Sequence, residues 1–156
     1  MSDYYTNFSL ALRLPNEAAQ TYAINLAEQA CQSQFENEVP ADFPAELRDH
    51  LEDWLFVVAA QTVEQQPGLW LHSQNGGVDS VCAFLQHLLQ KFDPVGVVTF
   101  EWSHDCSKPR TDAYGGRAAV VTARKIKTMS TSQWLQKQTA ALVCPLKPSR
   151  SSPSAP

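Results

Sequence analysis

The 156-residue chain contains no apolar run of the ~18 residues that a membrane-spanning helix requires. Its first residues include neither a basic segment nor a long apolar one, so they do not read as a secretory signal, and we expect a cytoplasmic protein without membrane contact. Cysteine is scarce, with four residues and no Cys-x-x-Cys pair, which argues against a disulfide-dense scaffold and favours reduced thiols. Hydrophobic residues make up 44% of the chain, which excludes disorder over most of its length.

The common signatures of cofactor and nucleotide binding are also missing. The chain has no Gly-x-Gly-x-x-Gly, no Walker phosphate loop and no Gly-x-Ser-x-Gly elbow, so we predict no cofactor. No set of potential ligands has a spacing diagnostic of a metal, and we predict no metal site. Residues 117–123 contain no aromatic side chain, so stacking of nucleic-acid bases on this strand is not supported.

Charge is distributed unevenly along the chain, although the formal net charge is only −4. Residues 1–93 carry 13 acidic and three basic side chains, whereas residues 94–156 carry three acidic and nine basic ones. Such asymmetry is typical of an interaction surface, and equally of two oppositely charged faces that keep a protein dissolved. Both interpretations remain open at this point.

The spacing of apolar residues predicts strands that alternate with helices. Strands are expected at 8–14, 55–64, 69–73, 95–102, 117–123 and 126–129, and helices at 17–30, 45–53 and 78–92 and from Ser130 onward, with a loop at 33–44 and a turn at Pro67-Gly68. The order predicts an α+β protein with a ferredoxin-like β-α-β-β-α-β core, in which an antiparallel sheet carries helices on one face, plus a C-terminal β-hairpin strand and helix. We expect one domain over 1–144 and a disordered Pro/Ser-rich tail over 145–156.

The same periodicity predicts which side chains are buried. Trp70 and Leu85 are expected to be largely buried, while His50 and His87 are expected to be ordinary surface residues. Ser130-x-x-Gln133 matches a capping box that opens the last helix. The apolar residues of that helix are expected to face inward, namely Trp134, Leu135, Ala141 and Leu142.

A long polar stretch, 103–116, is the main candidate for function. Hairpin loops usually have 2–5 residues, and long loops on a rigid scaffold are often functional. The candidate binding residues in and beside it are Trp102, His104, Cys106, Ser107, Lys108, Arg110, Tyr114, Gly115, Gly116 and Arg117. The two glycines would let backbone N–H groups approach a bound group closely, or would permit positive φ where the next strand starts.

Three chemistries fit this stretch. Lys108, Arg110 and Arg117 could bind a phosphate or carboxylate, although basic residues on an edge strand also serve only to prevent aggregation. Cys106 could act as a thiolate nucleophile with His104 nearby, although a structural cysteine explains it equally simply. His104, Asp105 and Cys106, joined by His72, could hold a metal only if the fold brought them together.

The stretch from Phe100 to Ala123 carries a resemblance to a known group of proteins. Trp102 precedes a Cys-Ser-Lys-Pro-Arg run, and Tyr-Gly-Gly-Arg-Ala-Ala-Val-Val-Thr-Ala follows. This pattern resembles small, largely uncharacterised bacterial proteins, some carried by phages and plasmids. In that group a third glycine stands where this chain has Arg117. The resemblance implies a bacterial cytosolic or mobile-element setting and supplies no activity.

Taken together, these features predict a small non-enzymatic binding or accessory module. It would engage a partner through the basic hairpin 103–127, and the partner would be an acidic protein surface or the phosphates of a nucleic acid. The alternative is a small enzyme that uses Cys106, His104, Lys108 and Arg110. Exposed edge strands can pair across a two-fold axis, so the sequence is also compatible with a homodimer.

Overall fold

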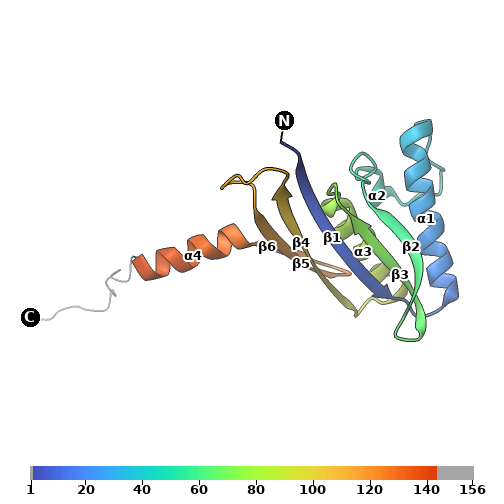
Figure 1. Cartoon of the computed structure of the whole chain (residues 1–156). Coiled ribbons are helices and arrows are strands. Elements are labelled where there is room, and N and C mark those ends of the chain that lie inside the picture. The colour runs from blue at the N-terminus through green and yellow to red at the C-terminus, as the bar shows by residue number, and fades with distance from the viewer. Residues whose placement is uncertain (1, 144–156) are drawn as a thin grey trace, which may run out of the picture.

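The computed structural model of the chain describes residues 2–143, and the tail expected at 145–156 lies outside the described residues. One antiparallel sheet carries helices on one of its faces, and the last helix extends away from the sheet (Figure 1). The elements are β1 (Tyr4–Arg13), α1 (Glu17–Glu36), α2 (Ala45–Arg48), β2 (Val57–Val63), β3 (Gln66–Ser73), α3 (Val78–Phe92), β4 (Val97–Cys106), β5 (Gly115–Thr122), β6 (Ile126–Ser130) and α4 (Thr131–Val143).

The six strands lie in the order β2-β3-β1-β4-β5-β6, and all neighbours are antiparallel. The predicted α+β class is therefore confirmed. The order is longer than that of a four-stranded core, because β5 and β6 continue the sheet beyond β4. None of the helices in the described part of the chain combines the length and the apolar character that a membrane span needs.

The ends of the helices follow from local sequence. The Asn16 side chain accepts a hydrogen bond from the backbone N–H of Ala19 at 2.9 Å, which starts α1, and Asn37 ends it with a left-handed φ of 56°. The loop predicted from residue 33 therefore begins only after Glu36. The helix predicted at 45–53 is shorter than expected, since only one turn, α2, forms there.

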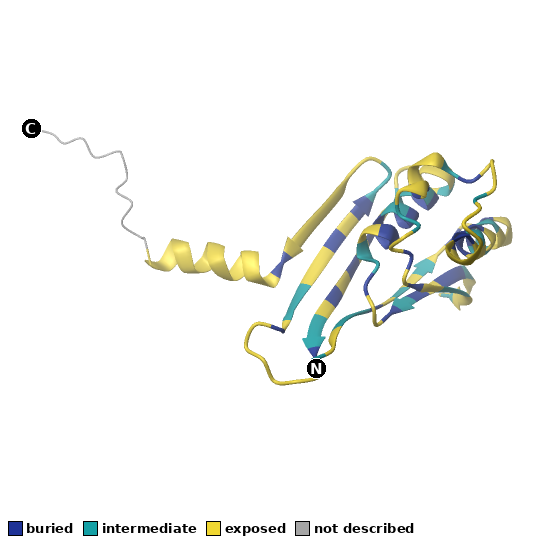
Figure 2. Cartoon of the chain, turned by 90° about the horizontal axis from the view of Figure 1, so that it is seen from above, coloured by how far each residue is buried: buried dark blue, intermediate teal, exposed yellow. Residues whose placement is uncertain are grey.

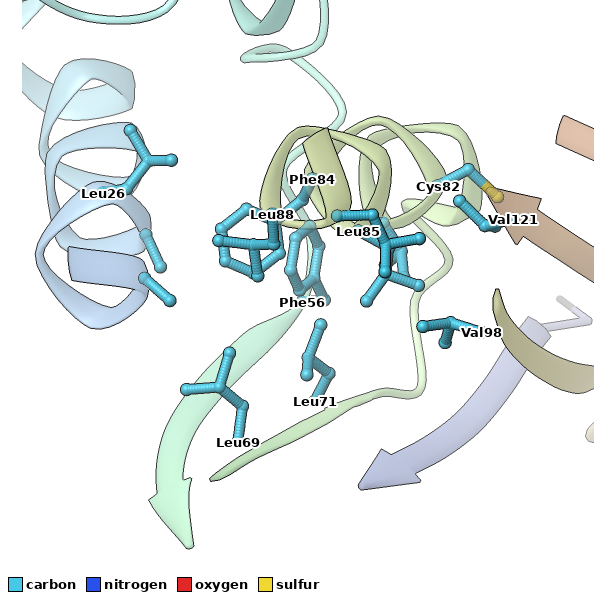
Figure 3. Packing of buried hydrophobic residues seen from close by; sticks show 14 of the residues in the cluster. Leu26, Phe56, Leu69, Leu71, Cys82, Phe84, Leu85, Leu88, Val98 and Val121 are labelled. Carbon is cyan, nitrogen blue, oxygen red and sulfur yellow. The ribbon is translucent and has the colours of Figure 1, made fainter. Parts of the chain in front are cut away.

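The hydrophobic core lies between the sheet and the two long helices, α1 and α3 (Figure 3). The predicted burial of Leu85 is confirmed, and the neighbouring Phe84 is equally inaccessible. From the sheet, Leu69, Leu71 and Val121 point into the same layer. The core thus joins both helices to strands from each half of the sheet.

The turn between β2 and β3 lies elsewhere than predicted. Glu64 and Gln65 form it, with φ of 50° and 67°, whereas Pro67 and Gly68 belong to β3. Two residues with positive φ between paired strands match the twist of a β-hairpin. A Cβ atom on Gly68 would lie 2.5 Å from the carbonyl oxygen of Leu12. This glycine therefore permits a close approach of neighbouring strands rather than a turn.

The second face of the sheet carries no helix, and its strands show alternating buried and exposed residues (Figure 2). The prediction that Trp70 is largely buried is wrong, since this residue is 40% exposed. Leu69 and Leu71 take the helix-covered face, and the period of two in a strand places Trp70 on the other. Its ring stacks on His72 at 4.0 Å between centroids, and its Nε1–H donates to Ser9 Oγ at 2.9 Å.

The sheet is split between its two central strands. The ladder between β1 and β4 contains four residue pairs and ends at Asn7↔Ser103, whereas β1 from Phe8 onward pairs only with β3. A cavity of about 480 Å³ opens beside the split under α3, where Leu10, Phe92 and Val98 are among the lining residues. The two halves of the sheet are therefore joined by a short ladder and by the packing of α3.

The last helix begins as predicted. Ser130 Oγ accepts from the N–H of Gln133 at 3.1 Å, and Gln133 Oε1 accepts from the N–H of Ser130 at 3.3 Å, which confirms the capping box. The prediction that its apolar residues face inward is wrong, because α4 has no buried residue. The helix leaves the sheet at its first turn (Figures 1 and 2), so Leu135 and Leu142 remain exposed within the described part of the chain.

Candidate functional site: the end of the β4–β5 hairpin

The predicted site residues divide between a strand and a loop. Strand β4 continues to Cys106, so residues 103–106 belong to the sheet and not to the loop expected there. The loop itself covers 107–114, and β5 begins at Gly115. The additional strand length comes from the pairing of β4 with β1 over residues 103–106 and with β5 as far as His104. This pairing fixes the direction in which each of these side chains points.

The side chains of β4 that were candidates for catalysis are engaged with β1 or buried. The Nδ1 atom of His104 lies 3.1 Å from Thr6 Oγ1, and Asn7 Nδ2 donates to Asp105 Oδ2 at 3.0 Å. Trp102 and Cys106 are buried on the helix side of the strand. These residues therefore stabilise the β1–β4 ladder, and His104 is oriented by Thr6.

No catalytic or metal arrangement is formed around Cys106. Among residues 2–143, no hydrogen bond joins the Cys106 thiol to His104, and no three His, Cys, Asp or Glu side chains converge as metal ligands. A nucleophilic cysteine requires a base within hydrogen-bond reach that is itself oriented by a third group. Thr6 orients the His104 ring, but His104, the nearby base, forms no hydrogen bond with the Cys106 thiol.

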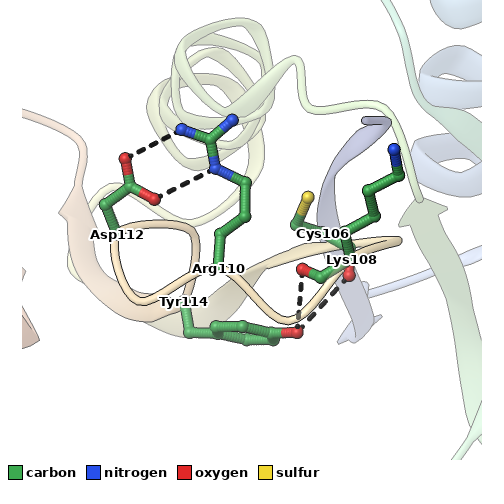
Figure 4. A network of polar contacts seen from close by, with 5 residues as sticks. All are labelled: Cys106, Lys108, Arg110, Asp112 and Tyr114. Atoms are coloured by element: carbon green, nitrogen blue, oxygen red, sulfur yellow. Dashed lines mark hydrogen bonds and ion pairs between the residues drawn. The ribbon is translucent and has the colours of Figure 1, made fainter. Parts of the chain in front are cut away.

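The loop is held in one shape by hydrogen bonds to the start of β1. The Ser107 N–H donates to the Asp3 carbonyl oxygen at 2.9 Å, and the Asp3 N–H donates to Ser107 Oγ at 3.0 Å. The Tyr114 hydroxyl donates to the carbonyl oxygens of Cys106 and Lys108, at 3.5 and 3.4 Å (Figure 4). Because these contacts pin both ends of the loop, its exposed side chains are presented on a fixed backbone.

The charges of the loop are only partly compensated. Arg110 Nε and Nη2 each donate to a carboxylate oxygen of Asp112 at 3.3 Å (Figure 4). These bonds lower the pKa of Asp112 and raise that of Arg110 relative to their ordinary values. The Arg110 guanidinium also lies 5.9 Å from the ring centroid of Tyr4. Lys108 is exposed and forms none of the ion pairs found in the described residues.

The two glycines and Arg117 lie in the first residues of β5. Of the two roles considered for the glycines, the one that requires positive φ is excluded, because neither Gly115 nor Gly116 has positive φ. The Gly116 N–H donates to Thr131 Oγ1 at 3.0 Å, which ties the start of β5 to the first turn of α4. Arg117 lies opposite Trp102 in the β4–β5 register, and its side chain is exposed.

The basic residues of 108–127 are spread over both ends of the hairpin and the strands between. Lys108 and Arg110 lie at one end of the β4–β5 hairpin, whereas Arg124 and Lys125 lie in the turn at the other end of β5. Arg117 lies near the start of β5, and Lys127 lies on β6 opposite Val120. The loop 107–114 itself therefore carries only two of these cations.

A polar network on the helix side of the molecule leaves no recognisable pattern in the sequence. The Tyr22 hydroxyl contacts His87 Nε2 at 2.8 Å, and His87 Nδ1 contacts Glu46 Oε1 at 2.7 Å. The prediction that His87 is an ordinary surface residue is wrong, since its side chain is only 11% exposed. The three residues come from α1, α2 and α3, and no local spacing in the sequence could relate them.

This network borders a cavity of about 580 Å³ that is also lined by Asp79 and Cys82. Burial, assisted by the charge of Asp79, raises the pKa of Cys82 to about 11, so its thiol stays protonated near neutral pH. Both ring nitrogens of His87 are engaged by neighbouring side chains. The network therefore ties three helices together.

The network predicts a pH dependence of stability. A hydrogen bond from its own backbone and one from His87 lower the pKa of Glu46. A lowered folded-state pKa contributes stability above the unfolded value of about 4.3, and this contribution is lost as pH falls through the folded value. The Glu46→Gln variant should lose less stability than the unmodified chain between pH ~5 and ~3. The difference should be below about 1 kcal/mol, since Glu46 is half-exposed.

Urea unfolding from pH 3 to 7 measures the free energy of unfolding of both proteins, with Glu52→Gln as the control variant. An unchanged pH dependence in Glu46→Gln would contradict the prediction.

Comparisons with known proteins do not assign this site. No family model matches the chain, and no curated protein matches it at a significant level. Among solved structures, a match is LarC2, the C-terminal domain of a cyclometallase involved in the synthesis of the NPN cofactor of lactate racemase, in its apo form. It is 12% identical, covers 92% of this chain and 97% of its own, and has a TM-score of 0.32. A TM-score this low carries no argument about fold or function.

Proposed function

We propose that the protein is a small binding module that engages an acidic surface of a protein partner through the loop 107–114 and the start of β1. The observation that carries this proposal is an exposed tyrosine, Tyr114, beside the uncompensated Lys108 on a loop whose backbone is fixed from both ends. Tyrosine and arginine are enriched among residues that dominate binding energy, and a preformed loop loses little freedom on binding. Tyr4 and Arg110 extend the same surface.

The arrangement of charges favours a protein partner over a nucleic acid. A polyanion is best bound by a long series of cations, and the loop that carries the proposed surface contains only Lys108 and Arg110. Arg110 is also engaged by Asp112. The acidic residues of 1–93, which outnumber the basic ones there, would repel a polyanion that approached from their side.

The proposed function is accompanied by a proposal for the core topology and for the biological setting of the protein. We infer that β1 to β4 form a ferredoxin-like core, which is supported by the order β2-β3-β1-β4 and by helices on one face of the sheet. The hairpin β5–β6 and α4 are additions to that core. The resemblance around Trp102 and Cys106 supports a bacterial, mobile-element setting.

Site-specific photo-crosslinking in the cells that naturally encode the protein tests the proposed function. A photo-reactive phenylalanine derivative replaces Tyr114 in the full chain, and the same derivative at Val95, which is 91% exposed on the α3–β4 connection, is the control. We expect one discrete crosslinked protein from position 114 and none from position 95. Once purified, that partner should bind the Lys108→Ala/Tyr114→Ala variant at least about tenfold more weakly than the unmodified chain.

A titration with nucleic acids separates the second class of partner. Generic duplex DNA, single-stranded DNA and RNA are each titrated at ~50 mM salt and above. If affinity falls with salt at a log–log slope of about −3 to −5, the protein contacts several phosphates and the protein-partner proposal is wrong. Equal crosslinking from both positions would likewise contradict it.

A further inference from the structure

Helix α4 has an apolar stripe that residues 2–143 leave exposed. Trp134, Leu135, Ala141 and Leu142 recur at positions i, i+1, i+7 and i+8, which lie on one side of a helix. All four are exposed, and Leu142 is 77% accessible to solvent. A 13-residue helix is marginal in water without tertiary packing, so this stripe requires a surface to pack against.

A groove of suitable character lies at the opposite end of the molecule. It has a volume of about 580 Å³ and is lined by the C-terminal part of α1 and the segment that follows α2, with Val39, Leu51 and Leu55 as its apolar residues. Leu55 of the groove is 46% exposed, and Phe35, which adjoins Gln34 of the groove wall along α1, is 86% exposed. The groove and its surroundings therefore expose apolar side chains to solvent.

The helix and the segment that supplies most of the groove wall differ in charge. The chain contains no acidic residue after Asp112, and α4 itself carries Lys137 and no acid. Residues 36–53 have the reverse composition, with seven acidic residues and a single basic one, Arg48, whose Nη2 donates to the Pro40 carbonyl oxygen at 3.0 Å. Glu52 and Arg48 are the charged residues that line the groove itself. An amphipathic helix without acidic residues in an apolar groove within an acidic segment fits an established mode of recognition.

Helix and groove cannot meet within one chain. The helix projects from β6 at one edge of the sheet, whereas α1 and α2, which supply part of the groove wall, lie toward the β2 edge (Figure 1). We propose that α4 of one copy of this chain docks in the α1–α2 groove of a second copy, and that a two-fold axis makes the exchange reciprocal. Each copy then supplies one helix and one groove, so the pair is closed and exposes no further binding surface of this kind.

The interface uses neither the loop 107–114 nor the edge-strand pairing that the sequence suggested. It is therefore independent of the proposed function: a variant in α4 leaves the crosslink at position 114 intact, and a variant at Lys108 leaves the self-association intact. At the edge itself, β6 carries Lys127, and lysine on an edge strand opposes strand-to-strand pairing.

Analytical ultracentrifugation of the full chain tests the proposal. We expect the unmodified chain to sediment as a dimer within about 1–200 µM, with weaker association at high salt because the contact is partly electrostatic. A helix variant, Leu135→Ser/Leu142→Ser, and a groove variant, Phe35→Ser/Leu55→Ser, should each dissociate at least about tenfold more readily. The control Val95→Ser should remain dimeric. Far-UV circular dichroism and thermal unfolding confirm that each variant is folded, as expected for exposed positions.

Mixing the two variants distinguishes exchange from other modes of pairing. The helix variant retains an intact groove and the groove variant an intact helix, so a labelled 1:1 mixture should form a heterodimer through one restored contact. A mixture that stays monomeric, or a groove variant that still dimerises, would show that α4 does not dock in this groove. A chain that stays monomeric throughout the concentration range overturns the proposal, including the case in which it binds anionic lipid vesicles through Trp134 instead.

Discussion

Replacing Leu85 by alanine should lower the free energy of unfolding by roughly 2–5 kcal/mol, the range observed for large-to-small substitutions in protein cores. Leu85 lies at the centre of α3, is inaccessible to solvent and packs in the layer between the helix and the sheet. Its removal leaves a cavity whose walls belong to both α3 and the strands, so the surroundings have little freedom to collapse into it. The loss of buried apolar surface and the cavity therefore add together.

Urea unfolding followed by tryptophan fluorescence measures this effect. The Val95→Ala variant, at a position that is 91% exposed, is the control and should change stability by less than about 0.5 kcal/mol. A loss below about 0.5 kcal/mol for Leu85→Ala would mean that the buried face of α3 is assigned wrongly.

A second large effect is expected at Gly68. A Cβ atom added there would lie 2.5 Å from the Leu12 carbonyl oxygen and 2.7 Å from Val63 Cγ2. The backbone oxygen cannot rotate away as a side chain would, so β1 and β3 must separate to admit even a methyl group. We expect Gly68→Ala to destabilise the protein by about 1–3 kcal/mol or more, the range for overpacking a well-packed region.

The matched substitution for this prediction is Gly76→Ala. Gly76 has a positive φ of 97°, but a Cβ atom there would be no closer than 3.8 Å to Thr6 Cβ. Gly76→Ala therefore carries the cost of an unfavourable backbone conformation alone, about 1–2 kcal/mol. Because Gly68 does not have positive φ, a comparison of the two melting temperatures separates steric clash from backbone strain. A Gly68→Ala variant as stable as the unmodified chain would contradict the close approach of β1 and β3.

The elements with strong periodicity were predicted well from the sequence. Helix α3 was expected at 78–92 and has those bounds, because its apolar stripe is wide and Asp93-Pro94 ends it. Position within a strand was less predictable: the Pro67-Gly68 pair resembles a turn, but the register of β3 against β1 makes it part of a strand. The inward assignment of Trp134 and Leu135 failed for another reason. An amphipathic pattern indicates that one face of a helix is apolar, but it does not identify the element or molecule that packs against that face.

The candidate site could be located from sequence only in part. The long loop and its cations were visible as a polar stretch, and the structure places Lys108, Arg110 and Tyr114 together at the hairpin end. The engagement of His104 by Thr6 depends on which residues of β1 face β4, and that register is set by long-range pairing. For the same reason the contact between Tyr22, His87 and Glu46 was invisible, since it requires three helices to be placed in space.

The short ladder between β1 and β4 has a consequence for how the molecule opens. Four residue pairs join the sheet half β2-β3-β1 to the half β4-β5-β6, so few backbone hydrogen bonds must break for the halves to part. Groups of strands like these often unfold as cooperative units. Each unit has its own free energy of opening, which amide hydrogen exchange measures. We expect the strands β4 to β6 with α4 to open as one unit once Val98, Phe100 and Val121 lose their packing in the core that both halves share. The hairpin loop lies where this unit is fastened to β1, so a partner bound there would hold the two halves together.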